Sequence, residues 1–210
     1  MKLLASITVF SLVTLFYSCS GEDNSGTNPS NTIKLTDTTL ATDEVVVDSA
    51  LFSDRPSTEE MLESFEYCKE NAENSMTCKY FIAKAICWYY DITDFETEDG
   101  RYVDFEEIRP IVLSSKAWHL AGPASSQSAL DAAMNAANEG KAAIAISERD
   151  KYGHVVLILP GKGEKAPAWG GLTCPNVASF FMVPGLEPFV DKSMAYAWNS
   201  PDGIQVYVRD

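Results

Sequence analysis

The sequence predicts an α+β domain between residues 51 and 210, in which helices come first and an antiparallel sheet follows. Two observations support this fold class. Apolar residues recur at helical spacing in the first part of the domain, and after Gly140 they change to short apolar runs separated by turn residues. Helices followed by strands are typical of domains in which helices cover an antiparallel sheet. A segment of about 160 residues is long enough for one such domain with its own core.

Four helices are expected from start signals and apolar spacing. The first begins within 56–60, with Ser57 or Thr58 as N-cap and acidic residues in the first turn. The second begins near 75–77, and its apolar face consists of Phe81, Ile82, Ala85, Ile86 and Tyr89. The last two cover 104–113 and about 126–138, and Gly140 ends the fourth.

Strands are expected after Gly140. The run from 141 to 147 predicts a buried strand, residues 148–153 a hairpin connection, and 154–159 its partner. The Pro-Gly-Lys-Gly sequence at 160–163 breaks the pattern. Further strands are expected at 178–183, 195–198 and 204–209. His119 is expected to lie in a loop before the fourth helix.

The N-terminus has the features of an export signal. Lys2 precedes an apolar stretch at 3–17, which is shorter than the roughly 20 residues that span a membrane. The stretch ends in LFYSC, which resembles a lipobox with Cys19 as the lipidated residue; a plain secretory cleavage site is the alternative. We therefore expect a signal peptide at 1–18, a lipidated Cys19 with a flexible tether at 19–50, and a folded domain at 51–210.

The acidic residues directly after Cys19 resemble the surface-export signal of Bacteroidetes lipoproteins, and a solvated acidic linker is the alternative. These features predict an exported protein held by lipid to the bacterial outer membrane, on its periplasmic face or at the cell surface. The formal net charge is −14, and removal of residues 1–18 loses only Lys2, which makes it −15. Such a charge argues against nucleic-acid binding, which needs basic patches.

Cys78 is the candidate nucleophile among the four cysteines that remain after Cys19. Its predicted place in the first turn of the second helix favours a thiolate, because the helix dipole and free N–H groups stabilise negative charge there. Cys87 lies in mid-helix and is expected to be a buried, inert thiol. The alternative for Cys78 is a disulfide, most plausibly with Cys68, and the pairing stays open. With no CxxC pair and only two histidines, we expect no structural zinc and no cofactor.

His154 is the candidate base. It opens a predicted strand in GHVVLI, where its ring could face the N-terminus of a helix packed on the sheet, and a third polar group would orient the ring. A structural histidine is the alternative. The acidic segment containing Asp94, Glu96, Glu98, Asp99 and Asp104 lacks EF-hand spacing, so an exposed acidic loop is favoured over a calcium site.

Two motifs resemble those of papain-like cell-wall amidases of the CHAP and NlpC/P60 type. CKYFIA, beginning at Cys78, resembles the Cys-x-x-Phe-Val helix signature, and GHVVL, containing His154, resembles the Gly-His-Val strand. The resemblance covers roughly 60–183 and implies a papain-like fold that needs no cofactor. It also implies an amidase or endopeptidase of peptidoglycan stem peptides, in which Cys78 forms an acyl-enzyme and His154 exchanges the proton. The third residue would be Asn176 or, alternatively, Asn199, although the family often has an acid soon after the histidine and this chain offers only Glu164.

Two other functions compete with this one. A hydrolase of the same fold could act on another amide or thioester, and a non-catalytic surface lipoprotein could bind a peptide, glycan or protein partner. An enzyme predicts a free Cys78 within hydrogen-bond reach of His154. A binding protein predicts a bridged Cys78, or a His154 ring that points elsewhere.

Overall fold

The computed structural model describes residues 49–73, 77–148 and 153–210. The predicted signal peptide and tether, including Cys19, lie outside the described residues apart from 49 and 50. Every described residue belongs to one compact unit, Asp43–Asp210. Within the described ranges, no helix has both the length and the apolar character needed to span a membrane.

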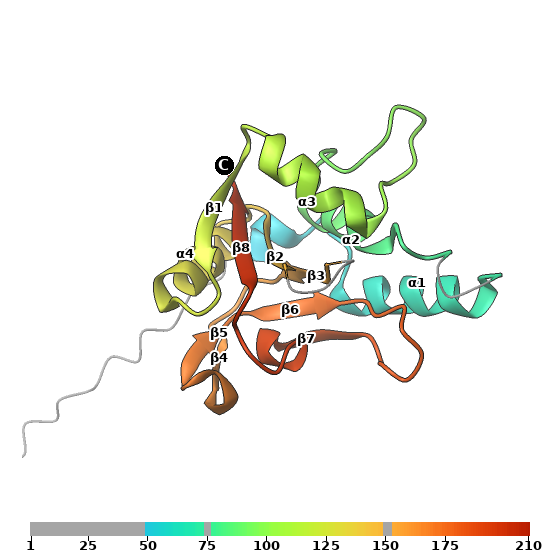
Figure 1. Ribbon diagram of the computed structural model, residues 1–210. Helices are drawn as coiled ribbons and strands as arrows, with labels where there is room; N and C mark the ends of the chain where they lie inside the picture. The colour runs from blue at the N-terminus through green and yellow to red at the C-terminus, as the bar shows by residue number, and fades with distance from the viewer. Residues whose placement is uncertain (1–48, 74–76, 149–152) are drawn as a thin grey trace, which may run out of the picture. The chain divides into compact units, whose positions relative to one another are not determined.

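The α+β fold class is confirmed by a six-stranded antiparallel sheet with four α-helices (Figure 1). The strand order is β1 (Trp118–Pro123), β8 (Ile204–Arg209), β2 (Ala143–Ser147), β3 (Val155–Ile158), β6 (Asn176–Ser179) and β7 (Phe189–Ser193). A separate two-stranded sheet pairs β4 (Glu164–Ala166) with β5 (Leu172–Cys174). The α-helices are α1 (Thr58–Asn71), α2 (Phe81–Tyr90), α3 (Phe105–Ser114) and α4 (Gln127–Asn138), with short 3₁₀-helices η1 (Ser49–Phe52), η2 (Pro167–Trp169) and η3 (Met194–Tyr196).

Local capping explains why two helices begin where the sequence predicts. Ser57 is the N-cap of α1, and its hydroxyl accepts from the Glu60 amide at 3.1 Å while the Glu60 carboxylate accepts from the Ser57 amide at 2.7 Å. Asp104 and Glu107 form the equivalent capping box at α3. Each box satisfies N–H groups that have no partner inside the helix. The predicted end of α4 near Gly140 is also confirmed.

The predicted start of the second helix is wrong. Residues 77–80 form a turn, and α2 begins at Phe81 after Tyr80, which makes no side-chain cap. Residues 74–76, which include the predicted cap Ser75, lie outside the described residues. The apolar stripe along the helix is as predicted, because Phe81, Ile82, Ala85, Ile86 and Tyr89 are all buried.

The central strands agree with the sequence prediction and the edge strands do not. β2, β3 and β8 lie where their apolar runs predicted them, whereas the strand predicted at 178–183 appears two residues early as β6. The segment 195–198 is not a strand, because η3 covers its first half and the edge strand β7 precedes it. β1 is the other edge and contains His119, which was expected in a loop; its pairing with β8 is irregular between Leu120 and Gly122.

Side-chain alternation gives the sheet two differently covered faces. Ile144, Ile146, Val155, Leu157 and Tyr207 share one hydrophobic cluster with residues of α1, α2 and α3. We call this the first face. Ala143, Ala145, Val156, Ile158 and Val206 belong to a second cluster with α4, on the opposite or second face. Figure 1 likewise shows α4 beside β1 and β8 and apart from α1 and α2.

Candidate functional site

Cys78 is bonded to another cysteine. Its sulfur forms a disulfide with Cys68, which lies in the second half of α1. The sequence left the disulfide pairing open, and this bond is the alternative that it favoured for Cys78. A nucleophilic cysteine must carry a free thiolate. The sulfur that a hydrolase would need at Cys78 is therefore already bonded.

The position of Cys78 also differs from the expected one. It lies in the turn before α2, and its carbonyl accepts from the Phe81 amide at 3.0 Å. The residue is almost fully buried within the first-face cluster. Cys78 and the disulfide therefore connect α1 to the turn that leads into α2, inside the layer of helices.

His154 lies immediately before β3, and other side chains surround its ring. Nε2 is 2.8 Å from the Ser179 hydroxyl, and the ring stacks on Phe181 with centroids 4.4 Å apart and planes 10° apart. Trp198 meets the same ring edge-on at 5.5 Å. Burial lowers the pKa of His154 from 6.5 to about 4, so the ring is neutral at pH 7. A base with so low a pKa accepts a proton weakly.

Strand alternation places Cys78 and His154 on opposite faces of the sheet. Val155 and Leu157 of β3 belong to the first-face cluster, and Val156 belongs to the second. The ladder continues through His154, because its carbonyl accepts from the Ser147 amide at 2.9 Å. His154 therefore shares the face of Val156. Its partners agree, since Phe181 and Trp198 pack against the second cluster. The structure does not bring the expected nucleophile and base together.

Within the described residues, the hydrogen bond of the His154 ring is to Ser179 and to neither candidate for the third residue. Asn176 begins β6, its carbonyl accepts from the Leu159 amide at 2.8 Å, and its Oδ1 is buried without a partner among the described groups. Asn199 is exposed in a bend after Trp198. The sequence analysis did not identify Ser179. The feature that could have indicated it is a small polar residue inside the strand expected at 178–183, after the strand that begins with His154.

The two free cysteines among the described residues are also unsuited to nucleophilic chemistry. Cys87 on α2 and Cys174 at the end of β5 are both buried. Burial raises the pKa of each thiol to about 11, so both stay protonated near neutral pH. The expectation that Cys87 is a buried free thiol is confirmed.

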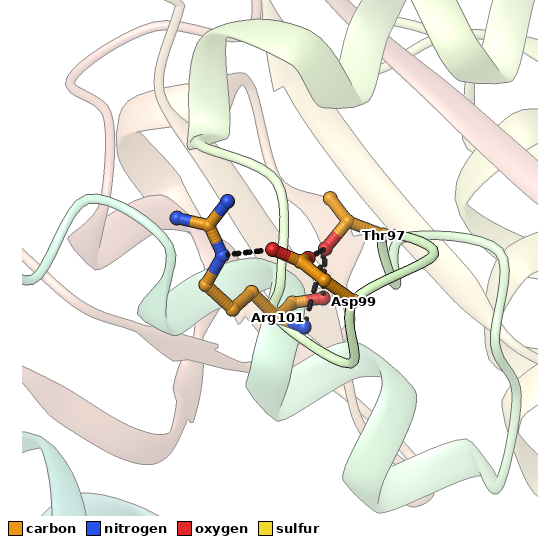
Figure 2. Close-up of polar contacts among 3 residues, drawn as sticks. All are labelled: Thr97, Asp99 and Arg101. Atoms are coloured by element: carbon orange, nitrogen blue, oxygen red, sulfur yellow. Dashed lines mark hydrogen bonds and ion pairs between the residues drawn. The ribbon is translucent and has the colours of Figure 1, made fainter.

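The acidic segment forms an internally bonded loop (Figure 2). Thr97 donates its hydroxyl to Asp99, and Arg101 Nε donates to the other Asp99 oxygen at 2.7 Å. Asp94 instead accepts from Trp118 Nε1 at 2.9 Å and from Arg209 Nε at 3.1 Å. Two of the carboxylates considered for calcium are thus bonded to protein donors, and the described residues contain no group of three or more metal-ligating side chains.

Taken together, the candidate residues form two separate centres. One is a buried disulfide among helices α1 and α2, and the other is a neutral histidine bonded to a serine on the opposite face of the sheet. Acyl transfer needs a nucleophile and a base within hydrogen-bond reach of each other. Comparison with known proteins adds no family assignment, since no protein-family model matches the chain and no curated protein matches its sequence.

Proposed function

We propose that this protein is a lipid-anchored envelope lipoprotein whose domain binds a partner and does not catalyse hydrolysis. One observation carries the proposal: Cys78 is bridged to Cys68 while the His154 ring lies on the other face of the sheet. Those are the two features that a binding protein predicts. Reduction of the disulfide alone would free the sulfur but would still leave it without an adjacent base.

The proposal includes a papain-like domain that has lost its cysteine–histidine pair. The packing of α2 against β3 supports this arrangement, as does the antiparallel order of β2, β3 and β6. A fold can be kept when the chemistry is lost, because packing and catalysis depend on different residues.

A group of exposed apolar side chains supports a binding role. Val183, Leu186 and Tyr196 are 58%, 46% and 69% exposed, and all lie next to β7 in the chain. The Tyr196 ring lies 6.3 Å from that of Phe189, and Lys192 Nζ lies within 6 Å of both rings. We call Val183, Leu186, Lys192 and Tyr196 the β7 surface; Phe189 itself is buried. Exposed aromatic and aliphatic side chains of this kind are typical of contact surfaces for a peptide, a glycan or a protein.

The first experiment separates binding from hydrolysis. The mature chain with Cys19→Ser is incubated with purified peptidoglycan sacculi, and both co-sedimented protein and released muropeptides are measured. We expect no muropeptide release with or without reductant, and the same result for Cys78→Ser. Release that is lost in Cys78→Ser would overturn the proposal and restore the amidase. Retention on sacculi that falls in a Leu186→Ser/Tyr196→Ser variant would identify peptidoglycan as the partner.

The anchor has its own test. Cells that express the protein are labelled with an alkyne fatty acid, and the wild type is compared with Cys19→Ala. We expect label and membrane association in the wild type and loss of both in the variant. Equal labelling of the two proteins would contradict lipidation at Cys19.

A further inference from the structure

His154 connects the start of a central strand to two irregular segments. Phe181, stacked on the ring, lies in the connection between β6 and β7, and Trp198, against the ring edge, lies in the connection between η3 and β8. Residues 180–188 and 197–203 have no regular secondary structure. These segments lack the hydrogen-bond ladder of a strand. Their side-chain contacts with the sheet therefore contribute a larger share of their local stability.

Among the described residues, few hydrogen bonds join these segments to the rest of the domain. Within 180–188 the backbone bond is the local turn from the Leu186 amide to the Val183 carbonyl at 3.2 Å, and Phe180 is buried on the first face. In 197–203, Trp169 Nε1 donates to the Trp198 carbonyl at 3.0 Å, and the Glu148 amide donates to the Gly203 carbonyl at 2.7 Å. Other bonds of 197–203 are local ones, from the Ala197 amide to the Met194 carbonyl, from the Ser200 hydroxyl to Asp202, and from the Ile204 amide to the Pro201 carbonyl. The contacts of Phe181 and Trp198 with one imidazole ring are thus a shared attachment point for two connections that are far apart in sequence.

We propose that His154 is an acid-sensitive clamp: protonation of its ring loosens residues 180–188 and 197–203 from the second face of the sheet. Within the described residues, the neutral ring bonds to the Ser179 hydroxyl, and Phe181 and Trp198 cover part of its remaining surface. An imidazolium has two N–H donors and a charge, and keeping them partly buried without partners is costly. The charged ring gains hydration when Phe181 or Trp198 moves away.

The ionisable side chains on the surrounding elements contact other groups or lie exposed. Glu148, after β2, pairs with Arg109 at 2.6 Å, and Asp191 on β7 accepts from Thr58. Asp202 accepts from the Ser200 hydroxyl at 2.7 Å, and Lys192 lies over the rings of Phe189 and Tyr196. Glu187 is exposed in the loop between β6 and β7. Within the described residues, the hydrogen bond of the His154 ring is to the Ser179 hydroxyl. The low pKa of His154, caused by burial, agrees with a ring that takes up a proton only when the clamp opens.

The test is hydrogen exchange by mass spectrometry between pH 7 and pH 4, corrected for intrinsic exchange, on the mature chain with Cys19→Ser. The opening equilibrium of 180–188 and 197–203 should rise about tenfold or more between pH 6 and pH 4.5, while peptides from α4 and β8 stay protected. His154→Phe, which stacks without titrating, should remove this rise. His154→Gln, which keeps a polar partner for Ser179, is the second variant if phenylalanine prevents folding.

The chain offers a matched control, because it has two histidines. His119 is exposed on β1 and pairs with Asp210 at 3.1 Å, so His119→Gln should respond to acid as the wild type does. Two results would overturn the proposal: unchanged protection of both segments down to pH 4.5 in the wild type, or an equal rise in both non-titrating His154 variants. Neither outcome depends on whether the domain binds or hydrolyses anything.

Discussion

The two faces of the sheet are stabilised in different ways. The first face packs large aromatic rings, with Phe65, Phe81 and Phe180 at centroid distances of 4.9 to 5.2 Å, and a disulfide connects its helices. The second face packs small residues of α4, such as Ala133 and Ala137, and it contains the His154–Ser179 pair. The two candidate catalytic residues therefore belong to different layers: Cys78 is buried in the first-face cluster, and the partly buried His154 ring packs on the second face. Motifs that follow one another in the expected order do not make a site unless their side chains share a face.

The largest effect is expected from Phe65→Ala on the first face. Phe65 is fully buried between Phe81 and Phe180. Removal of a buried phenylalanine ring costs about 3–5 kcal/mol of unfolding free energy, which urea denaturation can measure. Tyr67→Ala, on the same helix but exposed, is the matched control and should cost less than about 0.5 kcal/mol. Equal losses would mean that α1 does not pack tightly on the first face.

The next effect is expected from loss of the disulfide. The bond closes a short loop, since its cysteines are 10 residues apart. A closed loop of this length contributes about 3 kcal/mol by limiting the unfolded chain. Cys68→Ser/Cys78→Ser should lower the unfolding free energy by about that amount, and reductant should do the same to the wild type. Reductant should not affect the double variant, and a wild type insensitive to reductant would argue that the bond is absent.

Acid should destabilise the second face through His154. The folded-state pKa is about 4 and the ordinary value is 6.5, so the unfolded chain binds more protons between these values. Stability from the neutral ring is complete above about pH 6.5, falls as the pH drops, and is lost below about pH 4. At about 1.4 kcal/mol per pH unit the limit is about 3 kcal/mol, and the partly exposed surface of His154 should reduce it.

Denaturation curves at intervals between pH 7 and pH 4 measure this dependence. The difference between wild type and His154→Gln should shrink steadily over the range. A constant difference would show that the ring does not titrate with folding. His119→Gln should run parallel to the wild type, because His119 is an exposed residue on β1.

A smaller effect is expected at the side-chain hydrogen bond from α2 to a backbone carbonyl of β3. The Tyr90 hydroxyl donates to the Ile158 carbonyl at 2.6 Å, and both residues are buried. Tyr90→Phe leaves that carbonyl unsatisfied at a cost of about 1–2 kcal/mol. Tyr67→Phe serves as the exposed control in the same denaturation assay. No difference between the two variants would indicate that water replaces the lost donor.

The smallest effect is expected outside both faces, in the loop of Figure 2. Arg101 and Asp99 form an ion pair at 2.7 Å, but their side chains are 79% and 56% exposed. Exposed pairs contribute little because water and salt screen them. Arg101→Ala should leave the thermal midpoint unchanged in calorimetry. A drop as large as that of Tyr90→Phe would mean that the loop supports the core.

Several elements could be predicted because their signals are local. The capping boxes at Ser57 and Asp104 depend on residues three positions apart, so the starts of α1 and α3 follow from the chain alone. β2, β3 and β8 are apolar runs that are buried on both faces. The edge strands β1 and β7 were missed because each has several exposed positions and therefore a weak apolar pattern.

By itself, the sequence determined the α+β class and the order of the central strands along the chain. Only the tertiary structure decided that Cys78 is bonded to Cys68, that α2 begins at Phe81, and that His154 faces Ser179. The physical reason is that these properties depend on pairing between distant segments. In a strand, the face of a side chain alternates at every residue, so a one-residue difference in register moves His154 from one layer of the molecule to the other.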